Sequence, residues 1–275
     1  MKNRSLMLMT IVVFGYALLY VPIISVVVYS FNDSRLVTLW GGFSLRWYVS
    51  LLSDEDLLGA ALLSLRIAIV SATVATALGA IVALALHRVN RLRGRLLLSG
   101  MVTAPLVMPE IITGLSLLFL FISMADLIGW PTSRGATTIT IAHITFSMAY
   151  VVVVVRSRLA AMDESLEEAA MDLGGRPVAV FFDITVPMLL PALVSGWLLS
   201  FTLSLDDLVI SSFVSGPGAT TLPMLIFAKV RLGVTPDINA ITTIIITVVA
   251  IAVATAAFVS GRREAAGVRP GAPER

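Results

Sequence analysis

The chain has 275 residues, of which 58% are apolar and only 13% are charged, and its formal net charge is +2. Together with a mean hydropathy of +0.97, this composition excludes an ordinary soluble domain and indicates a membrane protein with several spans. The pI near 9.2 does not indicate nucleic-acid binding, because the basic residues lie in short connections between apolar runs. Absence of cysteine excludes disulfides, thiolate metal sites and cysteine nucleophiles.

Six apolar runs are each long enough to cross the hydrocarbon core of a bilayer. They lie near residues 6–31, 58–86, 96–124, 137–159, 187–213 and 238–260. The first run is too long for a signal peptide and lacks a small-residue cleavage site, so we expect it to stay as a membrane anchor. We therefore predict an all-α integral membrane protein with six transmembrane helices. Residues 1–262 would form one transmembrane domain, and the Gly- and Pro-rich residues 263–275 would form a disordered cytoplasmic tail.

Basic residues in the connections predict the orientation of these spans, because Lys and Arg gather in short cytoplasmic loops. If the helices alternate, thirteen of the nineteen basic residues fall on one side. They are Lys2, Arg4, Arg88, Arg91, Arg93, Arg95, Arg156, Arg158, Arg176, Arg262, Arg263, Arg269 and Arg275. We therefore expect both termini in the cytoplasm.

The third apolar run contains two prolines and a carboxylate. Pro105 and Pro109 lie one turn apart and remove backbone donors, so we expect a break that faces protein or water. A carboxylate inside a span costs about 2.5–3.5 kcal/mol on insertion scales, which makes Glu110 a candidate for a substrate pathway. An ion pair with Arg66, at comparable depth in the second run, explains Glu110 equally well.

The two histidines do not predict a metal site. His87 ends the second run and His143 lies inside the fourth, and neither has a partner at metal-ligand spacing. We expect both to be ordinary packing or interfacial residues, and we predict no metal and no cofactor.

The polar segment 163–187 separates the fourth and fifth apolar runs. Ser165 and Glu168 have the S-x-x-E spacing of a capping box, which predicts the start of a helix. Gly174 would end that helix in a left-handed conformation, and Pro177 suits the first turn of a second short helix. Spacings of three, four and seven residues give the first helix one narrow apolar face, formed by Leu166, Ala169, Ala170 and Leu173.

Charge distinguishes a docking helix from a helix that lies on the membrane surface. Helices bound to lipid carry Lys and Arg on their polar face, whereas an acidic helix is repelled by anionic headgroups. This segment contains Asp163, Glu164, Glu167, Glu168 and Asp172. We therefore expect it to project towards a protein partner.

Two further carboxylates, Asp206 and Asp207, lie near the outer end of the fifth run. Adjacent residues point about 100° apart on a helix, so at most one faces a central pathway, and the pattern leaves open which one. With Glu110 they form three acids that a cation entering from outside would meet first. In the following loop, the Gly-Pro-Gly sequence at 216–218 predicts a turn before a short apolar helix that begins near Leu222.

The polar segment 163–187 resembles the EAA signature of ABC importer permeases. Glu168, Ala169 and Ala170 are followed by three residues, Gly174, nine residues and the sequence Ile-Thr-Val-Pro at 184–187, where valine replaces the usual leucine. The resemblance implies the type I importer fold, with this segment as the cytoplasmic coupling helix that enters a cleft of an ATP-hydrolysing subunit. It implies docking through Glu168, Ala169, Ala170, Gly174, Leu166 and Leu173.

Nearly the whole chain is similar to the polyamine (spermidine/putrescine) permeases of that family, and especially to those for putrescine. The similarity is carried by residues 29–32, 42–48, 104–114 and 202–224. It implies a transport subunit in the lipid of the bacterial inner membrane, not an enzyme. The implied partners are a second homologous permease in a heterodimer, two ATP-binding subunits and a periplasmic polyamine-binding protein.

Other functions fit the sequence less well. A phosphate-binding loop needs a lysine shortly after glycines, but Lys2 follows Met1 and Lys229 follows Ala228. A secondary transporter would need no EAA segment and often shows two repeated halves, and no repeat is visible. A membrane hydrolase lacks its G-x-S-x-G or H-E-x-x-H motif. The remaining alternative is an importer of the same type for spermidine, iron or another small solute.

Overall fold

The computed structural model describes residues 2–35, 39–89, 94–163, 165–233, 236–248 and 250–251. Within these ranges the regular structure is helical, apart from one isolated bridge between Asn32 and Phe43, so the all-α prediction is confirmed. The predicted tail at 263–275 lies outside the described residues. The chain divides into two compact units, Met1–Glu55 with Ile226–Arg275, and Asp56–Leu225. The single transmembrane domain over 1–262 stays a prediction.

The first unit contains helices from both ends of the chain. They are α1 (Lys2–Tyr29), α2 (Arg46–Leu51), most of α11 (Leu222–Leu232) and the helix Pro236–Val248. Large apolar side chains of α1 are exposed on every side of the helix, which suits a lipid or protein surrounding and not water. Lys229 of α11 donates to Asp54 at 2.8 Å and lies 3.6 Å from Asp237. The predicted turn and short helix near Leu222 are confirmed.

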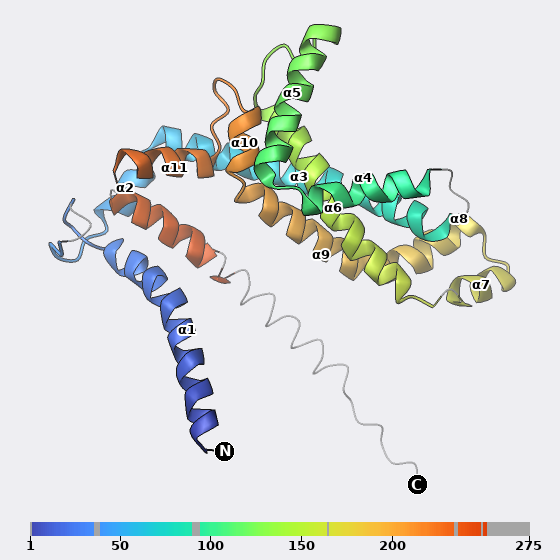
Figure 1. Cartoon of the computed structure of the whole chain (residues 1–275), viewed down its shortest axis with the longest axis horizontal. Coiled ribbons are helices and arrows are strands. Elements are labelled where there is room, and N and C mark those ends of the chain that lie inside the picture. Colours follow the sequence, from blue (N-terminus) through green and yellow to red (C-terminus); the bar gives the residue numbers. More distant parts are fainter. Residues whose placement is uncertain are drawn as a thin grey trace. The chain divides into compact units, whose positions relative to one another are not determined.

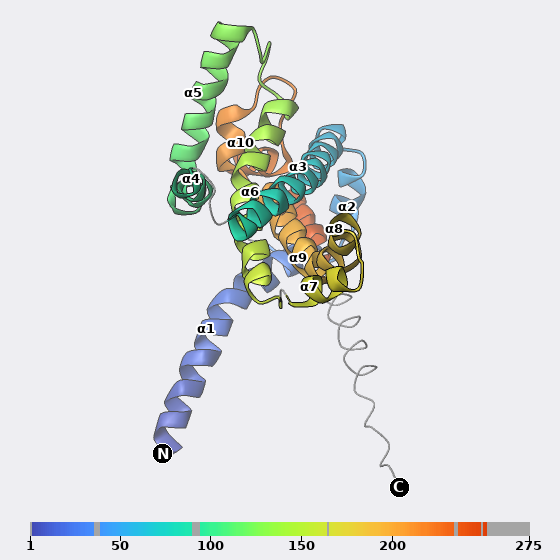
Figure 2. The same ribbon diagram turned by 90° about the vertical axis from the view of Figure 1, so that its right-hand side faces the viewer.

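The second unit contains the remaining long helices, and α6 lies at its centre. Its members are α3 (Glu55–Arg88), α4 (Arg95–Val107), α5 (Glu110–Ile128), α6 (Ala136–Ala160), α9 (Val186–Leu205) and α10 (Val209–Val214). Helix α6 is the most buried candidate span, and α9 runs beside it (Figures 1 and 2). The short helix α10 packs against α5 and α6.

Small residues allow α3, α6 and α9 to approach closely. A methyl group added to Gly79 of α3 would lie 2.8 Å from the Val151 side chain of α6. On the other side, a methyl group on Gly196 of α9 would lie 3.4 Å from Val151. Val151 is fully buried between these two glycines, so backbone proximity of the kind favoured in membranes holds the three helices together.

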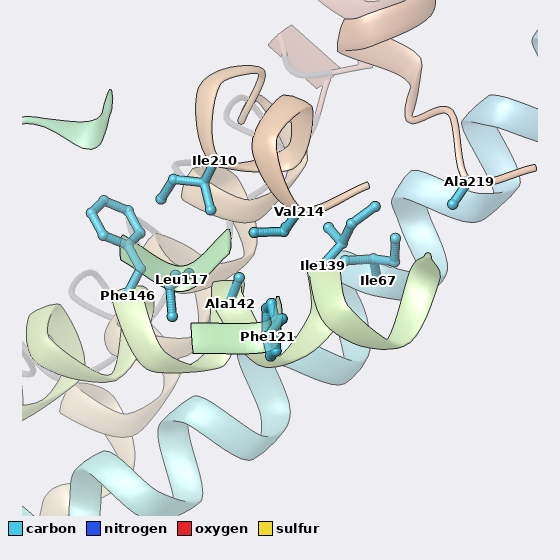
Figure 3. Close-up of a cluster of buried hydrophobic side chains, with 9 residues drawn as sticks. All are labelled: Ile67, Leu117, Phe121, Ile139, Ala142, Phe146, Ile210, Val214 and Ala219. Carbon is cyan, nitrogen blue, oxygen red and sulfur yellow. The ribbon is translucent and has the colours of Figure 1, made fainter. Parts of the chain in front are cut away.

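An apolar core lies at the other end of α6, where α3, α5 and α10 meet it (Figure 3). Its buried side chains are Ile67, Leu117, Phe121, Ile139, Ala142, Phe146, Ile210, Val214 and Ala219. The short helix α10 contributes Ile210 and Val214, both fully buried. This packing fixes the turn between α9 and α10, which carries the two adjacent aspartates.

Five helices are long and apolar enough to cross a membrane among the described residues. The sixth predicted run begins in the helix Pro236–Val248 and continues into residues outside the described ranges. The third run differs from a continuous span. Helix α4 ends at Val107, Met108 is extended, and α5 begins after Pro109, so the predicted break is confirmed there.

Candidate functional site

The predicted docking segment folds as two short helices and a π-helical turn. They are α7 (Ser165–Asp172), α8 (Pro177–Val180) and the turn Phe181–Thr185, which leads directly into α9. No residue of α7 is buried in this chain. Leu173 is 91% exposed and Leu166 47% exposed, so the apolar face expected to dock remains uncovered.

The start of α7 differs from the predicted capping box. Ser165 already belongs to the helix, and its backbone amide donates to the Asp163 carboxylate at 3.0 Å. Capping by Ser165 was therefore wrong, because Asp163 supplies the acceptor. Glu168 is exposed on the surface of α7.

Glycine ends α7 as predicted. Gly174 has a φ of +90°, a left-handed conformation that glycine adopts without a Cβ penalty. The Gly175 amide donates to the Ala170 carbonyl at 3.0 Å, and a methyl group on Gly175 would lie 2.7 Å from that carbonyl oxygen. Pro177 begins α8. The predicted end of the first helix at Gly174 and the start of the second at Pro177 are therefore confirmed.

Glu167, which in the sequence is only one of several acids of this segment, has specific partners in the structure. Its Oε1 atom accepts a hydrogen bond from the Thr185 hydroxyl at 2.6 Å and another from Arg88 of α3. Glu168, one residue later, is exposed and forms no side-chain hydrogen bond or ion pair within the part of the chain that the structure describes. Both glutamates border the hollow beside His87 and Arg88, but the Glu167 side chain is only 21% exposed, whereas Glu168 is exposed.

The second candidate site is the turn between α9 and α10. Asp206 caps the C-terminal end of α9, and Asp207 follows in the turn. With Glu110 in the first turn of α5, all three candidate acids lie at helix ends. For Asp206 and Asp207 the expectation of a continuous helix was wrong, because α9 ends at Leu205. For Glu110 the break at Pro109 is the predicted one.

Asp207 is buried and fully engaged. Its side chain is 7% exposed, and its carboxylate accepts from the backbone amides of Ser211 at 2.7 Å and Ile210 at 3.2 Å. Its Oδ2 atom also lies 3.1 Å from Nε2 of His143. These bonds hold the first turn of α10 and attach it to α6.

His143 of α6 has more polar partners than an ordinary packing residue. It is buried on α6, with Nδ1 2.6 Å from the Ser204 hydroxyl and Nε2 also 3.1 Å from the Ser211 hydroxyl. A carboxylate only accepts, so Nε2 carries the proton donated to Asp207. The Ser71 hydroxyl of α3 donates to Ser204 at 3.0 Å. We call His143, Asp207, Ser204, Ser211 and Ser71 the polar hub.

The polar hub connects four elements, α3, α6, α9 and α10, inside an apolar bundle. From the sequence, His143 was expected to be an ordinary packing or interfacial residue, because it lacks a partner at metal-ligand spacing. The signal that identifies it is simpler: an ionisable side chain inside a span is expected to have a specific partner and a role. No sequence spacing predicts that this partner would be Asp207, 64 residues away.

Asp206 differs from its neighbour. It is exposed, and among the residues that the structure describes it makes no hydrogen bond or ion pair through its side chain to another residue. Glu110 and Arg66 are exposed too. No ion pair between them occurs in the described part of the chain, so the considered Glu110–Arg66 partnership is not formed.

These features define a class of protein. A bundle of apolar helices, with an exposed acidic segment between two spans and carboxylates at helix breaks, fits a membrane permease subunit. The chain belongs to the family described as "Binding-protein-dependent transport system inner membrane component", whose model matches residues 75–263.

Individual relatives agree with this family. The chain is 55% identical to the putrescine transport system permease protein PotI of Escherichia coli K12, over 97% of this chain and 95% of that one. It is 46% identical to the spermidine/putrescine transport system permease protein PotC of Haemophilus influenzae, over 84% and 87%. A bacterial ABC transporter that imports alginate shares the fold, with a TM-score of 0.73, 17% identity and 95% and 96% coverage.

Proposed function

We propose that this chain is the transmembrane permease subunit of an ATP-driven importer of putrescine. The observation that carries this proposal is the 55% identity to a putrescine permease over nearly the whole length of both chains. The chain supplies a pathway and a docking helix, and a partner supplies ATP hydrolysis. The substrate would come from a periplasmic polyamine-binding protein and leave to the cytoplasm.

The exposed helix α7 is the proposed contact with the ATP-hydrolysing subunit. Its uncovered face consists of Leu166, Ala169, Ala170 and Leu173, and Glu168 flanks it, with Gly174 ending the helix. Apolar side chains as exposed as Leu173 in a polar connection indicate a partner surface. An acidic helix in this position favours a protein over anionic lipid.

The pathway is proposed to run past Asp206 and Glu110 rather than past Asp207. Both acids are exposed within this chain, while the Asp207 carboxylate is committed to His143 and to two backbone amides. A diamine carries a positive charge at each end and can contact two separate carboxylates. Weak, distributed sites permit release as well as entry. Asp207 then holds the turn that presents Asp206.

The remaining subunits follow the family pattern. We propose a heterodimer with a second homologous permease, two ATP-binding subunits and the periplasmic binding protein, in the bacterial inner membrane. Both termini would face the cytoplasm, because thirteen of the nineteen basic residues fall on that side of the alternating spans.

Reconstitution of the four kinds of subunit in proteoliposomes tests the proposal. We expect ATP-dependent uptake of labelled putrescine that requires the binding protein and both permeases. Spermidine is the alternative substrate, favoured by 46% identity to a spermidine/putrescine permease, and it should compete poorly. Preferential uptake of spermidine would replace the substrate in the proposal, and absence of ATP-dependent uptake of either polyamine would contradict it.

A further inference from the structure

Helix α7 is attached to the rest of its unit by polar contacts and not by an apolar core. None of its eight residues is buried. The Glu167 side chain is only 21% exposed, and its Oε1 atom accepts from both Thr185 and Arg88. We call Arg88, Glu167 and Thr185 the junction. It joins three segments that lie far apart in the sequence.

Thr185 places the junction at the start of a long helix. It is completely buried and is the last residue of the π-helical turn Phe181–Thr185, immediately before α9. A π turn inserts extra backbone into a helix and occurs frequently at functional sites. Here its last side chain donates to Glu167 at 2.6 Å. Through this hydrogen bond, a shift of α7 would act directly on Thr185, the residue immediately before α9.

Arg88 places the other end of the junction on α3. It is the last residue of that 34-residue helix, where a cation is favoured by the helix dipole. Its guanidinium lies 6.0 Å from the Phe181 ring centroid and 3.5 Å from the Thr185 hydroxyl. Through this side chain, α3 contacts both α7 and the π turn.

We propose that Glu167 is a positioning residue that transmits displacement of α7 to α3 and α9, while Glu168 contacts the partner. This rests on the proposed docking of an ATP-hydrolysing subunit at α7. Adjacent residues on a helix point about 100° apart, so the inward and outward roles can fall to two neighbouring glutamates. Because α3 and α9 both contribute to the polar hub through Ser71 and Ser204, the junction and the hub act on the same two helices.

The test uses the complete transporter in proteoliposomes and compares matched variants of the two glutamates. Glu167→Gln keeps size but weakens acceptance from Arg88, and Thr185→Val removes the hydroxyl while keeping shape. We expect both to retain the ATPase subunit on purification, yet to raise the number of ATP molecules hydrolysed per putrescine by about fivefold or more. Thr185→Ser should restore the ratio, because it keeps the donor.

Glu168→Gln is the matched control, and it should weaken co-purification of the ATPase instead. An unchanged ATP-to-putrescine ratio in Glu167→Gln and Thr185→Val would overturn the proposal. Loss of co-purification in Glu167→Gln, to the same extent as in Glu168→Gln, would also overturn it, because Glu167 would then be a docking residue. If substitution of Thr185 simply caused misfolding, the membrane abundance of Thr185→Ser would fall together with that of Thr185→Val.

The wild-type complex separates this inference from the proposed function. If wild type neither retains an ATPase nor takes up putrescine, the proposed function fails. Amide hydrogen exchange of the full chain still tests the junction in that case. Glu167→Gln should accelerate exchange in α7 more than Glu168→Gln does, and equal rates in the two variants would overturn the link between α7 and its neighbours.

Discussion

Helix α7 and the polar hub handle their polar and charged groups in opposite ways. In α7 no residue is buried, and Glu168 and Leu173 remain exposed. In the hub, His143 and Asp207 are buried and each is hydrogen-bonded from several directions. We propose that another protein completes the exposed groups of α7, whereas the hub, whose groups are satisfied inside the chain, is structural. The comparison separates residues that act between subunits from residues that keep the bundle intact.

We expect the largest effect from substitutions in the exposed segment around α7. Glu168→Lys reverses a charge on the exposed face, and Gly174→Asp forces a side chain into a left-handed conformation at φ +90°. We expect uptake to fall about 100-fold, near the upper range of coupling free energies, while the chain remains in the membrane. Uptake and ATPase co-purification measure this. Normal uptake in both variants would contradict a docking role for α7.

The next largest effect is expected when a side chain of the polar hub is removed. His143→Leu removes the partner of Asp207 and Ser204 and leaves buried polar groups unsatisfied, which costs about 1–3 kcal/mol. We expect lower membrane abundance and a lower thermal midpoint in detergent. Thr145→Val is the matched control on the same helix, because that exposed hydroxyl bonds only its own helix backbone. Equal stability of the two variants would show that the hub contributes nothing to the fold.

The two adjacent aspartates in the turn between α9 and α10 are expected to have different roles. Asp206→Asn should lower uptake at subsaturating putrescine by about tenfold, equivalent to about 1.4 kcal/mol of lost attraction, with normal membrane abundance. Asp207→Asn should lower abundance as well, because its carboxylate holds α10 and His143. Measuring uptake and abundance together distinguishes the two roles. The reverse pattern would mean that Asp207 faces the pathway.

Glu110 provides a smaller test. Because Glu110 and Arg66 are exposed and form no ion pair with each other in the described structure, neither Glu110→Gln nor Arg66→Gln should reduce membrane abundance. Uptake should fall severalfold only in Glu110→Gln. A shared loss of abundance in the two variants, not additive in the double variant, would indicate that they pair in the assembled transporter.

The smallest expected effect concerns the start of α7. A hydrogen bond from the Ser165 side chain, together with its backbone amide, lowers the pKa of Asp163. Because the pKa of Asp163 is lowered in the folded state, its contribution to the stability of α7 is present above the unfolded pKa. That contribution is lost as the pH falls through the folded pKa. Amide exchange in α7 should therefore be faster in Asp163→Asn than in wild type at neutral pH. The difference should vanish at a pH below the folded pKa.

Local patterns in the sequence predicted much of the fold. Apolar run length predicted the spans, Pro109 predicted the break between α4 and α5, and Gly174 with Pro177 predicted the corner after α7. Each of these features depends on backbone chemistry within a few residues, such as a missing amide or a left-handed φ. Such features can be read without knowledge of the tertiary structure.

Partnerships between distant residues could not be read in this way. Asp207 meets His143 across 64 positions, and Glu167 meets Arg88 across 79. The sequence left open which of Asp206 and Asp207 faces a pathway, and it gave Glu167 no role beside Glu168. The tertiary structure distinguishes the members of each pair: Asp207 contacts His143 of α6, and Glu167 contacts Thr185 and Arg88.

Single-cysteine labelling is the most direct test of the proposed contact between α7 and an ATP-hydrolysing subunit. The chain has no cysteine, so Leu173→Cys, at a position 91% exposed, would be the only thiol. Leu232→Cys, at a position 92% exposed on α11, is the matched control. We predict that adding the ATPase subunits suppresses maleimide labelling of Leu173→Cys and leaves Leu232→Cys unchanged. Undiminished labelling of Leu173→Cys in the assembled complex would contradict the account.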